Sequence, residues 1–293
     1  MLLGAALVAR PALLLADEPA AHLDEATRER VLAVVRGEAD RGLSVIWVTQ
    51  NAMETAAADR IVHLGGPEPV WADVAASAPR SQDPPLLTLR IAPLACGDGP
   101  RIRVSSELDI HLSSTGVVAV VGPNGAGKSV LLTVAAGLLR LDQVEVVPLG
   151  AQQAPPLLVT QYPELQIFEE KVSDEIVYAA VCRGVPREAA LRSAARILER
   201  LGYGATSFLG RRTWSLSGGE KRILSLAGAL VAPASLLAID EPTAGLDPSR
   251  RVALAGLIEE SGSRRALLLA SQDREWLSRL AMRTYLIDAS APA

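Results

Sequence analysis

The chain has 293 residues, long enough for two domains that each bury a core. Hydrophobic residues make up 49% and charged residues 21%, as in ordinary globular proteins, and the net charge of −4 gives no reason to expect binding to nucleic acid or to an acidic membrane surface. No apolar run approaches the ~20 residues of a membrane span. Cys96 and Cys182 lack a metal-binding spacing, which favours free thiols in a reducing cytosol.

The first predicted elements form a short α/β segment. They are strands at 12–16, 43–49 and 61–64 and a helix at 26–36. The strand at 43–49 has the continuous apolar run typical of a central parallel strand. A stretch rich in Gly, Pro, Ala and Ser follows and predicts a linker. We therefore assign residues 1–66 to a first unit, 67–85 to the linker and 86–293 to a second unit.

The second unit alternates strands and helices, which predicts an α/β fold with a mainly parallel sheet. Strands at 87–91 and 101–110 are expected to form an antiparallel β layer, and a helical stretch at 173–201, broken near Pro186, is expected to form a helical subdomain. The other predicted elements are strands at 117–121, 236–239, 266–270 and 284–287 and helices at 128–138, 250–260 and 274–280.

An internal repeat relates the two units. Residues 6–24 (ALVARPALLLADEPAAHLD) match residues 229–247 (ALVAPASLLAIDEPTAGLD) at an offset of 223 positions, which pairs Asp17 with Asp240. A self-match of this length indicates two related units in tandem. Because Met1 aligns with Leu224, the first unit is expected to be a partial copy of the fold of the second.

A glycine-rich loop joins the strand at 117–121 to the helix that follows. Its residues 122–129 (GPNGAGKS) fit the pattern G-x-x-x-x-G-K-[ST], for which a chance match is on the order of a few in a thousand. Backbone N–H groups and the helix N-terminus hold phosphates in such a loop, Lys128 reaches the β and γ oxygens, and Ser129 ligates Mg²⁺. The candidate binding residues are Gly122, Pro123, Asn124, Gly125, Ala126, Gly127, Lys128, Ser129 and Val130.

Two carboxylates follow the strand at 236–239. An apolar strand that ends in Asp-Glu is common and usually means a solvated strand end. Downstream of a phosphate loop, it predicts that Asp240 joins the Mg²⁺ shell and that Glu241 orients or deprotonates the attacking water.

With residues 216–220 (LSGGE) and 245–247 (GLD), this ordered set of motifs resembles an ATP-binding cassette (ABC) ATPase. The resemblance covers residues 86–290 with the full motif set. It implies a P-loop NTPase fold of ABC type that binds ATP and Mg²⁺. It also implies a head-to-tail dimer, in which each ATP lies between the phosphate loop of one domain and the LSGGE of the other. By that match the dimer-side contacts belong to Ser217, Gly218, Gly219 and Asp247, and Gln161 links Mg²⁺ to a membrane partner.

The segment after Gln161 narrows the resemblance. Residues 161–170 (QYPELQIFEE) and 172–176 (VSDEI) resemble the same region of energy-coupling-factor (ECF) importers for vitamins and for cobalt or nickel, among which fused tandem ATPases are familiar. The resemblance implies a cytoplasmic ATPase subunit, peripheral on the inner face of the cell membrane, that binds integral membrane transporter subunits and no nucleic acid.

The chain departs from the family where a histidine is expected after the strand at 266–270. Gln272 stands there, and Gln50 stands at the matching position of the first unit. Glutamine can donate a hydrogen bond to phosphate but holds no charge. Hydrolysis is therefore expected to be about tenfold slower if the family residue works as a cation, and little changed if it only positions the same groups. The candidate catalytic residues are Glu241, Gln272 and Lys128.

Two further points concern completeness of the ATP sites. Leu86–Ile110 contains no aromatic residue to stack on adenine, and the first unit has neither a phosphate loop nor an LSGGE. Either two chains pair through their second units, or Met1 is a false start and a longer protein supplies the rest of the first domain.

Two other functions stay open. One is a regulatory nucleotide-binding subunit with negligible turnover, and the other is an ABC protein that acts on ribosomes or DNA, which the acidic net charge opposes.

Overall fold

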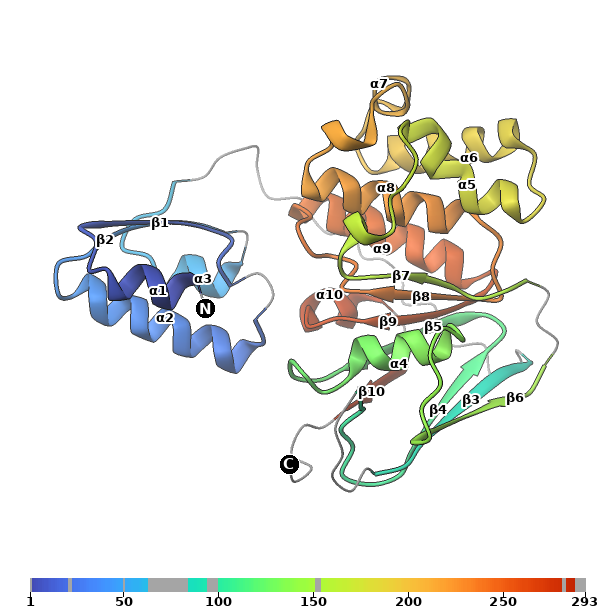
Figure 1. Ribbon diagram of the computed structural model, residues 1–293, viewed down its shortest axis with the longest axis horizontal. Helices are drawn as coiled ribbons and strands as arrows, with labels where there is room; N and C mark the ends of the chain where they lie inside the picture. The colour runs from blue at the N-terminus through green and yellow to red at the C-terminus, as the bar shows by residue number, and fades with distance from the viewer. Residues whose placement is uncertain are drawn as a thin grey trace. The chain divides into compact units, whose positions relative to one another are not determined.

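The computed structural model describes residues 2–20, 23–49, 51–62, 84–93, 100–150, 154–280 and 283–287 (Figure 1). Contacts divide the chain into two compact units, Met1–Pro69 and Val70–Ala293. The predicted linker falls almost wholly outside the described residues, as does Gln50. Among the described residues, no helix combines the length and the apolar character needed to cross a bilayer.

The smaller unit is built on a two-stranded parallel sheet. Its elements are α1 (Leu2–Val8), β1 (Leu13–Asp17), α2 (Glu25–Ala39), β2 (Ser44–Val48) and α3 (Ala52–Ala56). Helices α1 and α2 lie on the same side of this sheet (Figure 1). The elements predicted at 12–16, 26–36 and 43–49 are therefore present. The strand predicted at 61–64 is not seen at residues 61 and 62, and residues 63 and 64 lie outside the described residues.

One face of the small sheet is apolar and exposed. Leu15 is 67% exposed and Ile46 is 55% exposed, and these two residues lie opposite each other in the strand register, beside the exposed Leu13 and Val48. The prediction that residues 43–49 form a central strand is wrong for this unit, because among its described residues β2 pairs only with β1. Its apolar side chains suit a strand buried on both faces, but only one face is covered.

The larger unit contains a five-stranded sheet in which all neighbouring strands run parallel, in the order β10-β5-β9-β8-β7. This agrees with the predicted mainly parallel core. The strands are β5 (Gly116–Val121), β7 (Leu157–Val159), β8 (Leu236–Asp240), β9 (Ala266–Ala270) and β10 (Arg283–Leu286).

A separate antiparallel sheet has the order β4-β3-β6, with β3 (Pro85–Ile91), β4 (Leu108–Ser113) and β6 (Val144–Pro148). The predicted strand at 101–110 is wrong in its extent, because β4 begins only at Leu108. The backbone N–H groups of residues 102 and 103 form their hydrogen bonds outside the sheet: Arg103 N–H donates to the Ala126 carbonyl at 2.8 Å, and Ile102 N–H donates to Gln143 Oε1 at 3.0 Å.

Two hydrophobic cores lie on the two faces of the parallel sheet. Along β8, Leu237 and Ile239 belong to one core, and Leu236 and Ala238 belong to the other, as the alternation of side chains in a strand requires. Helix α4 lies on the face shared with the antiparallel sheet, and helices α8 and α9 lie on the opposite face (Figure 1). The helices are α4 (Lys128–Ala135), α5 (Val172–Cys182), α6 (Arg187–Arg200), α7 (Ala205–Leu209), α8 (Gly218–Val231), α9 (Pro248–Gly262) and α10 (Arg274–Arg279), with 3₁₀ turns η1 (Pro163–Leu165) and η2 (Thr213–Ser215).

The predicted helical stretch at 173–201 is two helices, α5 and α6, with the expected break between them. The helix predicted at 128–138 ends earlier, at Ala135, because Gly137 adopts a φ of +73°, which a continuing helix does not allow.

The two units share local geometry where their sequences repeat. Elements α1-β1-α2-β2-α3 follow in the same order as α8-β8-α9-β9-α10. Glu18 and Glu241, one residue after β1 and β8, have positive φ angles of 43° and 46°. Each donates its N–H to the last residue of the neighbouring strand, Val48 at 2.9 Å and Ala270 at 2.8 Å.

The helix after each repeat also begins in the same way. Asp24 caps α2 and Asp247 caps α9 with nearly equal backbone angles, and each side chain accepts a hydrogen bond from the backbone N–H three residues later. The sequence repeat therefore corresponds to a repeat of backbone conformation.

Candidate active site

The phosphate loop, residues 122–129, connects the end of β5 to the start of α4. Gly125 and Gly127 have φ angles of +76° and +99°, a region that favours glycine. A Cβ at Gly127 would collide with the Arg101 carbonyl oxygen and would lie 2.7 Å from Ile102 Cα, and one at Gly122 would collide with the Ile287 carbonyl oxygen. Glycine is thus required at both positions for the backbone to take this path.

Lys128 is 7% exposed and its Nζ donates to the carbonyls of Gly122 at 2.7 Å and Pro123 at 3.0 Å. The ammonium group is therefore held inside the curve of the loop. Asn124 and Gly125 at its tip are exposed, Ala126 is buried, and Val130 is half-buried in the first turn of α4. A loop with its N–H groups at a helix N-terminus and a cation inside it is suited to phosphate.

Asp240 and Glu241 lie at the carboxyl end of β8. Asp240 is buried and lies near Ser129, Lys128 and Arg222; burial is the largest effect on this carboxyl and raises its pKa. Burial also raises the pKa of Glu241, whose Oε2 accepts hydrogen bonds from Ser271 Oγ at 3.2 Å and from the Gln272 N–H at 3.3 Å.

Gln272 follows β9 and bridges two parts of the site. Its Nε2 donates to Asn124 Oδ1 at 2.5 Å, and its backbone N–H holds Glu241. Among the described residues, the Glu241 Oε1 and Gln272 Oε1 atoms are buried without a hydrogen-bond partner. Buried oxygens of this kind are ready acceptors for a bound water molecule.

These residues fit a magnesium nucleotide. The glycine cradle matches phosphate oxygens, and the hydroxyl of Ser129 beside the carboxylate of Asp240 forms an oxygen donor pair of the type Mg²⁺ prefers. The described residues contain no cluster of three or more His, Cys, Asp or Glu side chains that could hold a metal alone. Mg²⁺ in proteins usually binds through one or two side chains together with substrate phosphates, and the site has that character.

Arg222 connects this edge of the sheet to Gln161 and was not singled out from the sequence. It lies in α8, is buried, and donates to the carbonyls of Thr160 at 3.0 Å, of Asp240 at 3.2 Å and of Gln161. One guanidinium therefore holds the backbone at Gln161 and at Asp240 together. Gln161 is half-buried.

The segment 216–220 (LSGGE) begins α8, on the face of the sheet opposite α4 (Figure 1). Ser217 is the N-cap and forms a capping box with Glu220. Ser217 and Gly218 are exposed. A Cβ at Gly219 would approach the Gly245 carbonyl oxygen at 3.2 Å, so this segment contacts the loop before Asp247. Within this unit, LSGGE therefore begins a helix on one face of the parallel sheet, and the phosphate loop begins the helix α4 on the opposite face (Figure 1).

Comparison with known proteins shows which family has this architecture. A sequence model of the family described as "ABC transporter" matches residues 106–244. Protein BL0043 of Bifidobacterium longum, named as an ABC transporter ATP-binding protein, is 27% identical over 362 aligned residues, covering 98% of this chain and 46% of that protein. The energy-coupling factor transporter ATP-binding protein EcfA2 of Acetivibrio thermocellus is 30% identical over 193 residues, covering 62% of this chain and 68% of that protein. The chain thus spans about half to two thirds of the length of the curated relatives it matches.

A solved ABC transporter ATP-binding protein from Pyrococcus furiosus has the same fold, with a TM-score of 0.55 at 22% identity over 68% of this chain and 97% of that chain. A parallel sheet with a phosphate loop at its carboxyl edge, joined by an antiparallel sheet and a helical layer, defines a P-loop NTPase of ABC type. The chain belongs to the family of ABC transporter ATP-binding proteins.

Proposed function

We propose that the chain is an ATP-binding and ATP-hydrolysing subunit that powers a membrane importer, of the ECF type that takes up a vitamin or a transition metal ion. The observation that carries the ATPase part is the convergence of Lys128, Asp240 and Glu241 at one edge of the sheet, with Ser129 close to Asp240. The ECF part is supported by the relatives named EcfA2 and by the residues after Gln161.

In this proposal each residue has a separate role at the site. Backbone N–H groups of the phosphate loop and the Lys128 ammonium bind the phosphates of ATP, and Glu241 orients the attacking water and accepts its proton. Ser129, Gln161 and Asp240 would hold Mg²⁺, which would neutralise phosphate charge. Burial raises the pKa of Glu241, which makes its carboxylate a stronger base than that of a solvated glutamate.

A second ABC domain completes each ATP site in the proposal. Ser217 and Gly218 are exposed at the N-terminus of a 14-residue helix, where backbone N–H groups favour a phosphate presented by another domain. Asp247, the N-cap of α9, would contact that domain as well. The partner domain is a second copy of this chain or the remainder of a first domain.

We also propose that residues 1–66 are the C-terminal part of a first ABC domain, joined by the segment 67–85 to the domain at 86–293. The shared backbone angles at Glu18 and Glu241 support this proposal, as do the shared helix caps. The uncovered face of β1 and β2 supports it too, because the residues equivalent to Leu13 and Leu15 in the second unit, Leu236 and Ala238, are buried in a core that includes α4.

The membrane partner would dock on an exposed apolar surface that Leu165, Phe168 and Tyr178 form, in the segment after Gln161. Leu165 is 78% exposed and Phe168 is 63% exposed, and the Phe168 ring packs edge-on against Tyr178 with 4.6 Å between centroids. Exposed apolar side chains gathered in this way favour a protein interface. Docking there would hold the subunit, without a membrane span among its described helices, on the cytoplasmic face of the membrane.

Phosphate release from Mg-ATP tests the ATPase proposal. The full chain should turn over ATP, Lys128→Ala should lose at least 100-fold of that rate, and Glu188→Gln, at an exposed position of α6, should leave it unchanged. For the membrane partner, the chain should sediment with membranes from its own cells, and Phe168→Asp should release it. Turnover that survives Lys128→Ala would contradict the proposed site.

A regulatory subunit that closes on ATP with negligible turnover is a second candidate. The neutral bond between Gln272 and Asn124 favours it, because no cationic side chain occupies that position. A Glu241→Gln variant separates the two candidates, since an ATPase would lose turnover and a sensor would look unchanged.

A further inference from the structure

A cavity of about 870 Å³ lies at the opposite edge of the parallel sheet from the candidate active site. Its lining includes the residues directly before β5, β8 and β9: Ser114 and Thr115, Ser235, and Arg264 and Arg265. The phosphate loop follows the carboxyl end of β5, Asp240 is the last residue of β8, and Gln272 lies just after the carboxyl end of β9. The cavity is therefore distinct from the nucleotide site, and its volume is in the range of small-molecule sites.

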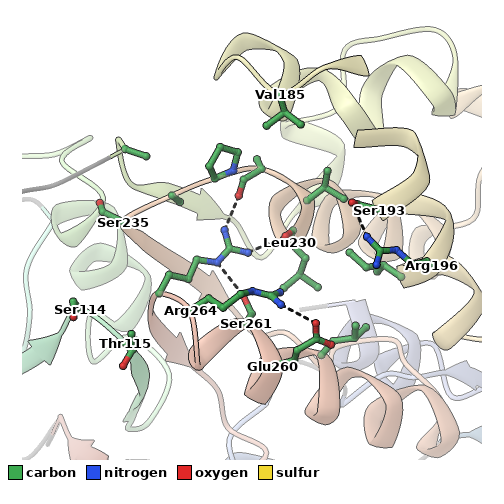
Figure 2. A pocket seen from close by; sticks show the side chains of 18 of the residues that line it. Ser114, Thr115, Val185, Ser193, Arg196, Leu230, Ser235, Glu260, Ser261 and Arg264 are labelled. Atoms are coloured by element: carbon green, nitrogen blue, oxygen red, sulfur yellow. Dashed lines mark hydrogen bonds and ion pairs between the residues drawn. The ribbon is translucent and has the colours of Figure 1, made fainter. Parts of the chain in front are cut away.

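The lining of this cavity is strongly positive. Arg196 and Arg200 belong to α6, and Arg264 and Arg265 follow the end of α9. Figure 2 shows Arg196 and Arg264 among the lining side chains. Among the described residues that line the cavity, Glu260 is the one acidic side chain. Four guanidinium groups and one carboxylate leave an excess of positive charge around a solvent-accessible space.

Glu260 is already shared between two of the arginines. Its Oε1 accepts from Arg264 at 2.8 Å and its Oε2 from Arg200 at 2.5 Å, and these two arginines lower the pKa of the Glu260 carboxyl. Each guanidinium carries five N–H donors, so both retain donors for another acceptor. Within the described part of the chain Arg196 forms no ion pair with a carboxylate, and it donates to Ser193 Oγ at 3.1 Å (Figure 2).

Arg265 has a structural role at the same place. It is buried, and its guanidinium donates to the carbonyls of Ala232 at 2.6 Å and Leu230 at 3.0 Å, which caps the end of α8. Burial, together with the positive charges of Arg264 and Arg183, lowers the pKa of Arg265 to about 10. Helix-end capping accounts for Arg265, but it does not account for Arg196, which lies within α6 one turn before its end.

We propose that this cavity binds a phosphate-bearing ligand, with Arg196 and Arg264 as its principal contacts and Arg200 beside them. The planar fork of arginine matches phosphate oxygens in a bidentate manner. An anion here would offset the unpaired charge of Arg196 and the excess charge around Arg265. The Ser114 and Thr115 side chains add hydroxyl groups to the same lining (Figure 2).

Calorimetric titration of inorganic pyrophosphate into the full chain carrying Lys128→Ala tests this proposal, because that substitution weakens phosphate binding at the nucleotide site. We expect saturable binding of one pyrophosphate per chain. Adding Arg196→Gln or Arg264→Gln should weaken it at least tenfold, since each removes charge-assisted hydrogen bonds. Arg192→Gln, also on α6 but outside the cavity lining, should leave it unchanged.

Sedimentation with phosphatidylglycerol vesicles distinguishes the source of the phosphate. Vesicle binding that Arg196→Gln and Arg264→Gln abolish would assign a lipid headgroup, and pyrophosphate binding without vesicle binding would assign a free ligand. The proposal is overturned if the chain shows no saturable pyrophosphate or vesicle binding, or if binding is indifferent to both substitutions. The test does not depend on ATP hydrolysis, so failure of the proposed function would leave its outcome interpretable.

Discussion

Replacing Gln272 by histidine should accelerate ATP hydrolysis. At present Gln272 Nε2 donates to Asn124 Oδ1 at 2.5 Å, a bond between neutral groups that contributes about 1 kcal/mol. A protonated imidazole at the same place would contact phosphate through a charge-assisted bond of about 1.5–3 kcal/mol. If that difference of about 0.5–2 kcal/mol appears only in the transition state, kcat rises by roughly 2- to 30-fold.

The pH dependence of kcat makes this prediction specific. Because a free histidine has a pKa near ~6.5, the advantage of Gln272→His should be largest near pH 6 and should decline toward pH 8. Gln272→Asn keeps a neutral amide and should give no gain. Phosphate release at saturating Mg-ATP between pH 6 and 8 measures both variants. A kcat that is unchanged by Gln272→His, or a gain that does not vary with pH, would refute the electrostatic reasoning.

Three other substitutions test the geometry of the site. Gly127→Ala should lower the melting temperature and abolish nucleotide binding, because it adds left-handed backbone strain of about 1–2 kcal/mol and a collision with the Arg101 carbonyl. Gly137→Ala adds the strain without a collision, so calorimetry should show a smaller fall in its melting temperature. Glu241→Gln should raise the melting temperature at pH 7–8, because burial raises the pKa of Glu241 in the folded state and the ionised carboxylate therefore opposes folding. The difference in melting temperature between the variant and the unaltered chain, followed by fluorimetry, should shrink as the pH falls through that pKa. Arg222→Met should destabilise the chain, because it leaves buried carbonyls unpaired at about 1–3 kcal/mol each, and it should also slow phosphate release. Normal turnover in a stable variant would contradict the role assigned to Arg222.

The parts of the fold that were predictable are those in which a local pattern determines the backbone. The glycines at 122, 125 and 127 and the apolar strand before them define a phosphate loop, and the repeat at 6–24 and 229–247 predicts matching turns at Glu18 and Glu241. In each case the residue type and its immediate neighbours fix the conformation, so the sequence is sufficient.

The features that were missed depend on contacts distant in the chain. Arg222 is one of many arginines, and its role arises from carbonyls 62 and 18 residues away, at Thr160 and Asp240. Residues 101–103 have a strand-like pattern, but they hydrogen-bond Ala126 and Gln143 in place of a neighbouring strand. The exposed face of β2 was missed for a related reason, because an apolar run indicates what a strand needs and not whether a covering layer is present.

The most direct test of the ATPase assignment is retention of radiolabelled ATP by the Glu241→Gln variant, with turnover measured in the same sample. If Glu241 is the base at a site formed by Lys128 and Asp240, the variant should retain ATP while its turnover falls about 100-fold or more, within the range that a positioned general base contributes. Turnover equal to that of the unaltered chain would contradict the account, because some other group would then activate the water or hydrolysis would not occur at this site.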